Sequence, residues 1–191
     1  MTEVSSRQSF LATRRGKLTL LLLCAIAFLD FVDASIVNIA LPDIRHDLNF
    51  SIQDLQWVLS GYLLTYGGFM LLGGRLGDLL GRRRILVSGT AVFATSSLVG
   101  GFAGSAGVLV GARLAQGIGA AMMSPAALSI LTTAFTNPRD RNLALGAWAA
   151  MPGLAGASGV VLSGALTQGP GWRWIFYLNL PIGFAALVVV T

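Results

Sequence analysis

The sequence contains little of what soluble enzymes and metal proteins depend on. Charged residues make up 11% of the 191 residues, and there is one cysteine, Cys24, and one histidine, His46. A single cysteine cannot form a disulfide within the chain, so cysteine usage leaves the redox compartment undetermined. His46 lies near Asp43 and Asp47, but the chain has no second histidine or other cysteine close by to complete a metal site. We therefore expect His46 to be a solvated surface residue.

Signatures of an enzyme active site are also absent from the sequence. There is no Ser/His/Asp set, and the glycine-rich stretch at 74–86 lacks the Lys-Ser/Thr of a phosphate-binding loop. We therefore expect no enzyme, no cofactor and no metal. The net charge of +5 could suggest nucleic acid, but the basic residues gather at the ends of apolar segments rather than on one face. We expect no nucleic-acid partner.

Long apolar segments are what the sequence has instead. A hydrophobic content of 54% and a mean hydropathy of +0.74 are typical of an integral membrane protein. The pattern predicts an all-α fold, a bundle of six transmembrane helices that follows a polar tail at 1–17. The spans are expected at 18–41, 57–76, 85–102, 108–135, 143–167 and 175–191. Pro42 is expected to stop the first span and to begin a polar outer loop at 42–56.

The distribution of basic residues predicts the orientation of these spans. All Lys and Arg residues except Arg45, Arg113 and Arg173 fall in the tail, in the 75–84 turn or in the 139–141 loop. These three segments would lie on one side of the membrane, and an excess of Lys and Arg marks the cytoplasmic side. We expect a multi-pass protein of the cell membrane with a cytoplasmic N-terminus.

The last apolar segment is short for a complete span. From Ile175 to Thr191 a helix would be about 25 Å long, whereas the hydrocarbon core is about 30 Å thick. We therefore expect the chain to be roughly one six-helix half of a longer transporter-like polypeptide, with the second half as its partner.

Three charged residues fall inside the predicted spans: Asp30, Asp33 and Arg113. A charge at that depth is costly and is by default a candidate functional residue. Asp30 and Asp33 share a helical face, where a proton or a cation would relieve their repulsion. Counted from Leu18 and Val108, Asp33 and Arg113 both lie about 22 Å from the inner side, which predicts that they pair. Asp30 would lie about one turn away, where it either joins the pair or only hydrogen-bonds a neighbouring helix.

The basic turn GRLGDLLGRRRIL at 74–86 carries a specific motif. It resembles the loop between spans two and three of the major facilitator superfamily, whose pattern is Gly-x-Leu-x-Asp-x-x-Gly-Arg-Arg/Lys. The matching residues are Gly74, Leu76, Asp78, Gly81, Arg82 and Arg83. A topogenic loop with a chance acid is the simpler alternative. The resemblance implies a conformational-switch loop whose acid and arginines latch against a helix of the second half.

Three further motifs in the expected order resemble the fourteen-span drug/proton antiporter branch of that superfamily. They are VDASIVNIALP at 32–42, RLAQGIGAA at 113–121 and GWRWIFYLNLPIG at 171–183. The resemblance implies that spans one and four are adjacent. It also adds Gln116 to Asp30, Asp33 and Arg113 as a candidate for proton and substrate coupling.

One segment departs from the branch pattern. Where the branch usually has Gly-Pro in its fifth-span antiporter motif, this chain has Gly159 followed by Val160. Pro152 could bend the helix two turns earlier instead. Small residues at this spacing predict close helix packing, and the candidate residues of this segment are Pro152, Gly156, Gly159 and Gly164.

Together these features predict a carrier. The expected function is proton-coupled export of small cationic or amphipathic compounds, with the 191-residue chain inactive alone and its partners being substrate, protons and the lipid bilayer. The alternatives are another proton-coupled major facilitator carrier, such as a metabolite exporter or symporter, and a noncatalytic membrane scaffold or sensor. The scaffold alternative does not require two acids and an arginine inside the spans.

Overall fold

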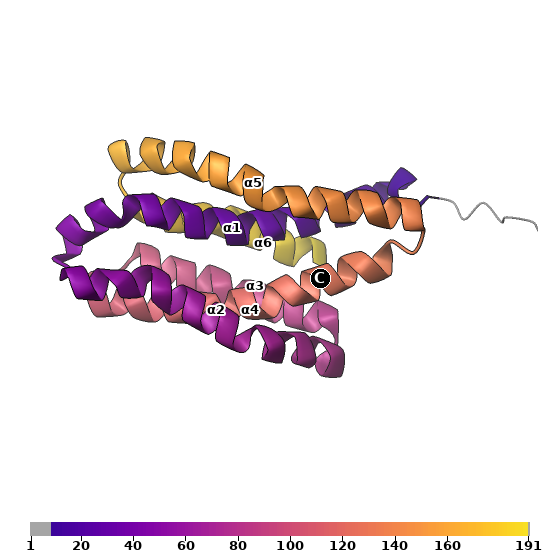
Figure 1. Ribbon diagram of the computed structural model, residues 1–191, viewed down its shortest axis with the longest axis horizontal. Helices are drawn as coiled ribbons and strands as arrows, with labels where there is room; N and C mark the ends of the chain where they lie inside the picture. Colours follow the sequence, from indigo (N-terminus) through magenta and orange to yellow (C-terminus); the bar gives the residue numbers. More distant parts are fainter. Residues whose placement is uncertain (1–8, 191) are drawn as a thin grey trace, which may run out of the picture.

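The computed structural model describes residues 9–190, which form six α-helices that run alongside one another (Figure 1). A short turn of 3-10 helix, Phe10–Ala12, comes first. The helices are α1 (Arg14–Leu48), α2 (Ile52–Leu80), α3 (Arg82–Gly101), α4 (Ala106–Ala134), α5 (Pro138–Gln168) and α6 (Arg173–Val190). Residues 9–190 contain no strand, so the all-α prediction is confirmed. Part of the predicted tail, 1–8, and the predicted end of the last span, Thr191, lie outside the described residues.

Five of the described helices, α1 to α5, are long and apolar enough to cross a membrane, judged by length and composition. The connections between helices are short, and side-chain caps define where several helices begin. These caps are Thr13, Ser51, Ser105 and Asn137, each of which accepts a hydrogen bond from a backbone N–H of the first turn. The sharpest connection is Gly81 alone, between α2 and α3, whose φ of 98° is open to glycine at little cost.

The prediction that Pro42 stops the first helix is wrong. Helix α1 continues through Pro42 to Leu48, so the outer loop expected at 42–56 reduces to residues 49–51. A proline removes one backbone hydrogen bond, and a long membrane helix tolerates that loss when its neighbours hold it in place. The helix ends instead at Asn49, which adopts a left-handed φ of 51°, and the Phe50 N–H donates to the Arg45 carbonyl at 3.1 Å.

Helix α4 lies between α2 and α3, while α5 packs on α1, and α6 contacts both α3 and α1. The approach of α2 to α4 depends on Gly117. A Cβ atom there would collide with the Thr65 hydroxyl and the Tyr62 carbonyl of α2. The Thr65 hydroxyl also donates to the Leu114 carbonyl of α4 at 2.9 Å. Close backbone contact therefore fixes α4 against α2, as small residues do in membrane helix pairs.

The buried apolar residues form two clusters. One includes Leu29, Phe93 and Leu131, and it lies toward the end where α1 and α5 begin. We call this the basic end because the first turns of α3 and α5 there carry Arg82 to Arg84 and Arg139. The other includes Val32, Ile36, Leu109 and Phe176, toward the opposite end. Polar side chains of α1 and α4 lie between the two clusters, where they must satisfy one another because water is scarce.

At the opposite end, Arg173 joins three elements. Its Nη1 donates to the Asp47 Oδ2 at 2.6 Å and its Nη2 donates to the Ala103 carbonyl at 3.2 Å. The Trp172 Nε1 donates to the same Asp47 oxygen at 3.1 Å, and the guanidinium lies 4.5 Å from the Trp172 ring centroid. The start of α6 is thus tied to the end of α1 and to the turn between α3 and α4.

We expect this contact to stabilise the bundle modestly, because both side chains are partly exposed. In a double-mutant cycle with Asp47→Asn and Arg173→Gln, the coupling free energy should be about 0.2–1 kcal/mol and should fall with added salt. Equilibrium unfolding in detergent micelles, followed by tryptophan fluorescence, measures it. Single effects that add to the double effect at low salt would contradict the contact.

Candidate functional site

The centre of the polar layer is an ion pair between α1 and α4. Arg113 Nη1 donates to Asp33 Oδ2 at 2.5 Å, and neither side chain is exposed. This pairing is what the matched depths of the two residues predict, so that prediction is confirmed. Arg113 Nε also donates to the Val58 carbonyl of α2 at 3.1 Å, and the guanidinium lies 4.2 Å from the centroid of the Tyr62 ring.

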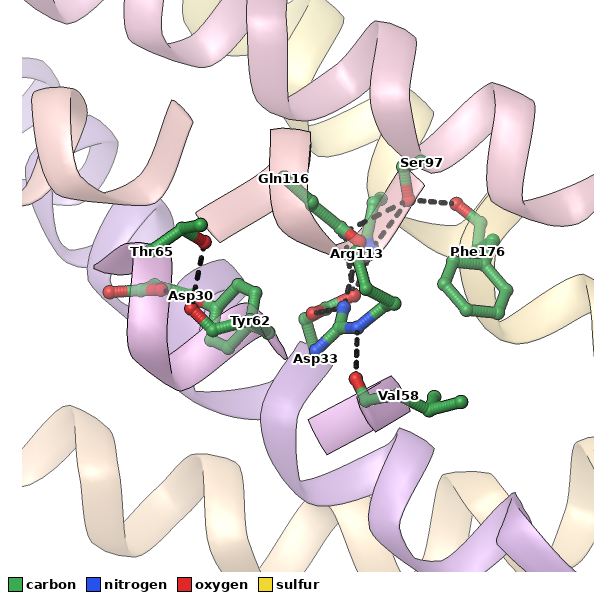
Figure 2. A network of polar contacts seen from close by, with 10 residues as sticks. Asp30, Asp33, Val58, Tyr62, Thr65, Ser97, Arg113, Gln116 and Phe176 are labelled. Carbon is green, nitrogen blue, oxygen red and sulfur yellow. Dashed lines mark hydrogen bonds and ion pairs between the residues drawn. The ribbon is translucent and has the colours of Figure 1, made fainter. Parts of the chain in front are cut away.

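Asp33 is held by amides as well as by the arginine. The Gln116 Nε2 donates to Asp33 Oδ1 at 2.9 Å, and the Asn179 Nδ2 of α6 donates to the same oxygen at 2.7 Å. Both amides reach the Ser97 hydroxyl of α3, which donates to the Phe176 carbonyl at 3.0 Å. Figure 2 shows Arg113 and Gln116 beside Asp33, with Ser97 close by. The network therefore joins α1, α2, α3, α4 and α6 at one point.

The burial of this network makes its charges strongly interdependent. Arg113, Gln116 and Ser97 are 0% exposed and Asp33 and Asn179 are 1% exposed. In such a low-dielectric setting an unpaired charge is very costly, whereas a pair with complete hydrogen bonding is tolerated. Among the described residues, the Arg113 Nη2 has no hydrogen-bond partner. The hydrogen bonds of Nε and Nη1 and the face of the Tyr62 ring hold the arginine in place.

The second acid, Asp30, belongs to a separate group of hydroxyls. The Tyr62 hydroxyl donates to Asp30 Oδ1, and the Ser124 hydroxyl donates to Asp30 Oδ2 at 3.3 Å. The Tyr66 hydroxyl in turn donates to Ser124 Oγ at 3.3 Å, and the two tyrosine rings stack with centroids 5.9 Å apart. Asp30 therefore hydrogen-bonds the neighbouring helices α2 and α4, and the Tyr62 ring that lies against Arg113 belongs to one of its donors. A part for Asp30 in proton exchange stays a prediction.

A cavity of about 460 Å³ lies beside this cluster of hydroxyls around Asp30. It is lined from α1, α2, α4 and α5 by Phe31, Tyr66, Met70, Ser124, Pro125, Leu128, Ser129, Thr132 and Trp148. The lining combines aromatic rings, apolar side chains and hydroxyls, which is the composition typical of small-molecule sites. Asp30 lies directly behind Ser124 in this wall.

The predicted switch loop is the connection between α2 and α3. Asp78 and Arg82 form an exposed ion pair at 3.8 Å, and the Arg82 Nη1 donates to the Ser129 carbonyl of α4 at 3.5 Å. A Cβ on Gly74 would lie 3.9 Å from Pro125. The loop therefore contacts α4 near the cavity, with an acid that remains accessible to other parts of a longer protein. Its role as a switch stays a prediction.

The antiporter segment of α5 is only partly packed. At Gly159 a Cβ would collide with the Ser35 side chain of α1, and the nearby Ser163 hydroxyl donates to the Ile36 carbonyl at 3.1 Å. At Gly156 and Gly164 a Cβ would meet open space, so packing among residues 9–190 does not require glycine there. Pro152 is inside α5 and exposed, and the helix continues through it.

Sequence reasoning did not select every residue of the network. Ser97, Ser124 and Asn179 are not among the residues that the sequence analysis selects, and neither are Tyr62 and Tyr66. The available signal was a polar residue within an apolar segment, as Asn179 is within GWRWIFYLNLPIG. That signal alone does not distinguish a network member from a serine that bonds its own helix, as Ser158 does.

We expect the ion pair to be strongly coupled in stability. Asp33→Asn or Arg113→Gln alone should each cost about 3–5 kcal/mol, because each leaves a buried charge without its partner. The double variant should cost clearly less than the two single costs together. Unfolding in detergent measures these differences, with Arg45→Gln at an exposed position of α1 as the control. Additive losses would show that the pair is not coupled.

Comparisons with known proteins point to one family of membrane proteins. Residues 23–191 match the Major Facilitator Superfamily. The puromycin resistance protein pur8 of Streptomyces alboniger is 43% identical over 169 residues, covering 88% of this chain and 34% of that protein. The cephamycin export protein CmcT of Amycolatopsis lactamdurans is 42% identical, covering 92% and 36%. The lincomycin resistance protein of Streptomyces lincolnensis is 40% identical, covering 93% and 37%.

The fold is shared with solved transporter structures. A bacterial homolog of the human lysosomal transporter Spinster, in an inward-facing and occupied conformation, matches 93% of this chain and 43% of that chain. The TM-score is 0.76 at 21% sequence identity, so this similarity concerns the fold. The present chain spans about a third of the length of the curated relatives. With its apolar helices, its four ordered motifs and a match over most of its length, the chain belongs to the Major Facilitator Superfamily, as a multi-pass membrane protein.

Proposed function

We propose that the chain forms part of a transporter that exports small cationic or amphipathic compounds across the cytoplasmic membrane in exchange for protons. The observation that carries this proposal is the fully buried Asp33–Arg113 pair with a second acid, Asp30, one turn away. Relatives whose names denote antibiotic resistance and export support the direction of transport. The basic end is the cytoplasmic side in this proposal, with the N-terminus on it.

Charge balance gives the exchange its physical basis. Arg113 neutralises one of the two buried acids, and one negative charge is left over when both acids are ionised. A proton or an organic cation can neutralise that charge, and binding of one disfavours binding of the other because both relieve the same cost. Gln116 holds both Asp33 and Arg113 in position, at 2.9 and 2.7 Å, so that the pair does not rearrange during this competition.

Transport requires parts beyond this chain. A site between the repeats of a transporter is exposed alternately to each side when one repeat moves against the other. The chain spans about a third of its curated relatives, so the moving partner is the remainder of such a protein. In this proposal Asp78 and its neighbouring arginines engage that remainder, and the 191-residue chain alone does not transport.

One observation favours a carrier other than a drug/proton antiporter. Val160 stands where the antiporter branch usually has proline, and it is 59% exposed on α5. This departure favours the second candidate, another proton-coupled major facilitator carrier such as a metabolite exporter or symporter. A scaffold or sensor is not favoured, because such a protein would have no use for buried charges that are costly to place in the membrane.

A chimera tests the proposal. Residues 1–191 would be joined to the remainder of the lincomycin resistance protein and expressed in a lincomycin-sensitive bacterium. We expect lincomycin efflux that an ionophore abolishes, and about tenfold slower efflux with Asp33→Asn, the change caused by ~1.4 kcal/mol in a coupled step. Asp43→Asn, at an exposed position of the same helix, should have no effect, and residues 1–191 alone should give none of the efflux.

The outcome separates the alternatives. Ionophore-insensitive efflux by the chimera would contradict proton coupling, and efflux by residues 1–191 alone would contradict the need for a second part. An Asp33→Asn chimera that exports at the normal rate would remove the buried pair from the mechanism.

The switch loop gives a second expectation for the same chimera. Asp78→Asn should slow efflux per inserted molecule several-fold while leaving membrane insertion intact, because the neighbouring arginines still set the orientation. Its ion pair with Arg82 is exposed and contributes at most about 1 kcal/mol to stability. Insertion is measured by surface labelling and efflux by substrate loss. Asp54→Asn at the other end of α2 is the control, and normal turnover of Asp78→Asn would refute a latch role.

A further inference from the structure

Asp30 differs from Asp33 in what surrounds its carboxylate. Asp33 receives hydrogen bonds from an arginine and two amides. Asp30 receives hydrogen bonds from the hydroxyls of Tyr62 and Ser124, and a hydroxyl can pass a proton on whereas an amide N–H does not do so readily. Since Arg113 already offsets Asp33, Asp30 holds the remaining charge of the polar layer. Neutralising Asp30 removes that charge without breaking the ion pair.

The hydroxyls next to Asp30 form an ordered chain of donors. The Tyr66 hydroxyl donates to Ser124 Oγ at 3.3 Å, and the Ser124 hydroxyl donates to Asp30 Oδ2 at 3.3 Å. Each link points toward the carboxylate. A chain with this polarity can deliver a proton to its end by shifting one O–H proton along each link.

The outer end of this chain opens on the cavity. Tyr66 and Ser124 both line the cavity of about 460 Å³, whose lining extends to Thr132, near the end of α4 at the basic end. Asp30 itself is 4% exposed and is reached through this wall. The cavity therefore extends from the two outer hydroxyls toward the basic end of the bundle.

We propose that Asp30 is the carboxyl that binds and releases the transported proton, and that Tyr66 and Ser124 relay this proton between Asp30 and the cavity. This inference rests on the proposed function and deepens it. In the uptake step a hydronium ion in the cavity gives a proton to the Tyr66 oxygen and becomes water, the original Tyr66 proton moves to Ser124 Oγ, and the original Ser124 proton moves to Asp30 Oδ2. Each oxygen of the relay ends with one proton, and the carboxylate becomes a carboxylic acid.

The groups facing Asp30 support a model in which Asp30 exchanges the proton and the Asp33–Arg113 pair stays intact. From α1 it faces Asp33, from α2 Tyr62 and Tyr66, and from α4 Ser124, with the Arg113 guanidinium on the far side of the Tyr62 ring. Trp148 contributes an apolar ring from α5 to the cavity. Tyr62 donates to Asp30 and its ring covers Arg113, so it separates the exchanging acid from the fixed pair while contacting both.

Infrared spectroscopy of the full 191-residue chain in lipid nanodiscs tests the assignment. One component of the pH-dependent carboxylic-acid C=O absorption of the wild type should be lost in Asp30→Asn and should persist in Asp33→Asn. On transfer to D₂O, Tyr66→Phe and Ser124→Ala should each slow deuteration of this component by about ten- to a hundredfold, the range for loss of a positioned proton-transfer group. Ser124→Thr, which keeps the hydroxyl, should restore the rate.

Matched controls make the result decisive. Ser129→Ala lines the same cavity outside the relay and should exchange as fast as the wild type. Retention of that component in Asp30→Asn would overturn the proton site, and wild-type exchange in both Tyr66→Phe and Ser124→Ala would overturn the relay. These measurements need no transport, so a chimera that fails to export would leave the assignment standing, and proton-coupled export with wild-type exchange in both variants would refute the relay alone.

Discussion

The structure depends on placing opposite charges side by side where water is scarce. Asp33 and Arg113 would each be prohibitively costly alone, and together they require hydrogen bonds on their remaining atoms. Val58, Gln116 and Asn179 supply such bonds from α2, α4 and α6, and Ser97 of α3 accepts hydrogen bonds from the two amides. Any displacement of one helix therefore strains the hydrogen bonds that the other helices make. Hydrophobic attraction does not drive helix association in a membrane, so this polar layer helps to hold together the helices whose apolar clusters flank it on both sides.

The backbone geometry that permits this pairing comes from small residues. Gly117 lies one residue after Gln116 and lets α4 touch the Tyr62 and Thr65 region of α2. That close approach brings the Arg113 Nε within 3.1 Å of the Val58 carbonyl and brings its guanidinium over the Tyr62 ring. A larger side chain at Gly117 would push apart the two helices that hold the arginine, so a packing residue indirectly controls the electrostatics of the site.

Much of this arrangement is predictable from the sequence, because hydropathy and charge act along the chain. The apolar segments predicted the helices. The matched depths of Asp33 and Arg113, together with the adjacency of spans one and four that the family resemblance implies, predicted their pairing. Helix ends were less predictable, since Pro42 does not stop α1 and Asn49 does. The positions of Ser97, Ser124 and Asn179 required knowledge of which helix faces meet, a property of three-dimensional packing that no single segment encodes. For the same reason the open space beside Gly156 and Gly164 was not foreseen.

The spacing of the two acids has a further physical consequence. If Asp33 were both the partner of Arg113 and the proton carrier, each protonation would leave a buried arginine without its counter-ion, at a cost of several kcal/mol. A second acid on the same face of α1 allows the charge to change next to the pair while the pair stays intact. Tyr62 makes this separation possible. Its hydroxyl hydrogen bond changes with the protonation of Asp30, while its ring remains against Arg113. A change at Asp30 can thus alter the α1–α2 contact without dismantling the junction of the helices.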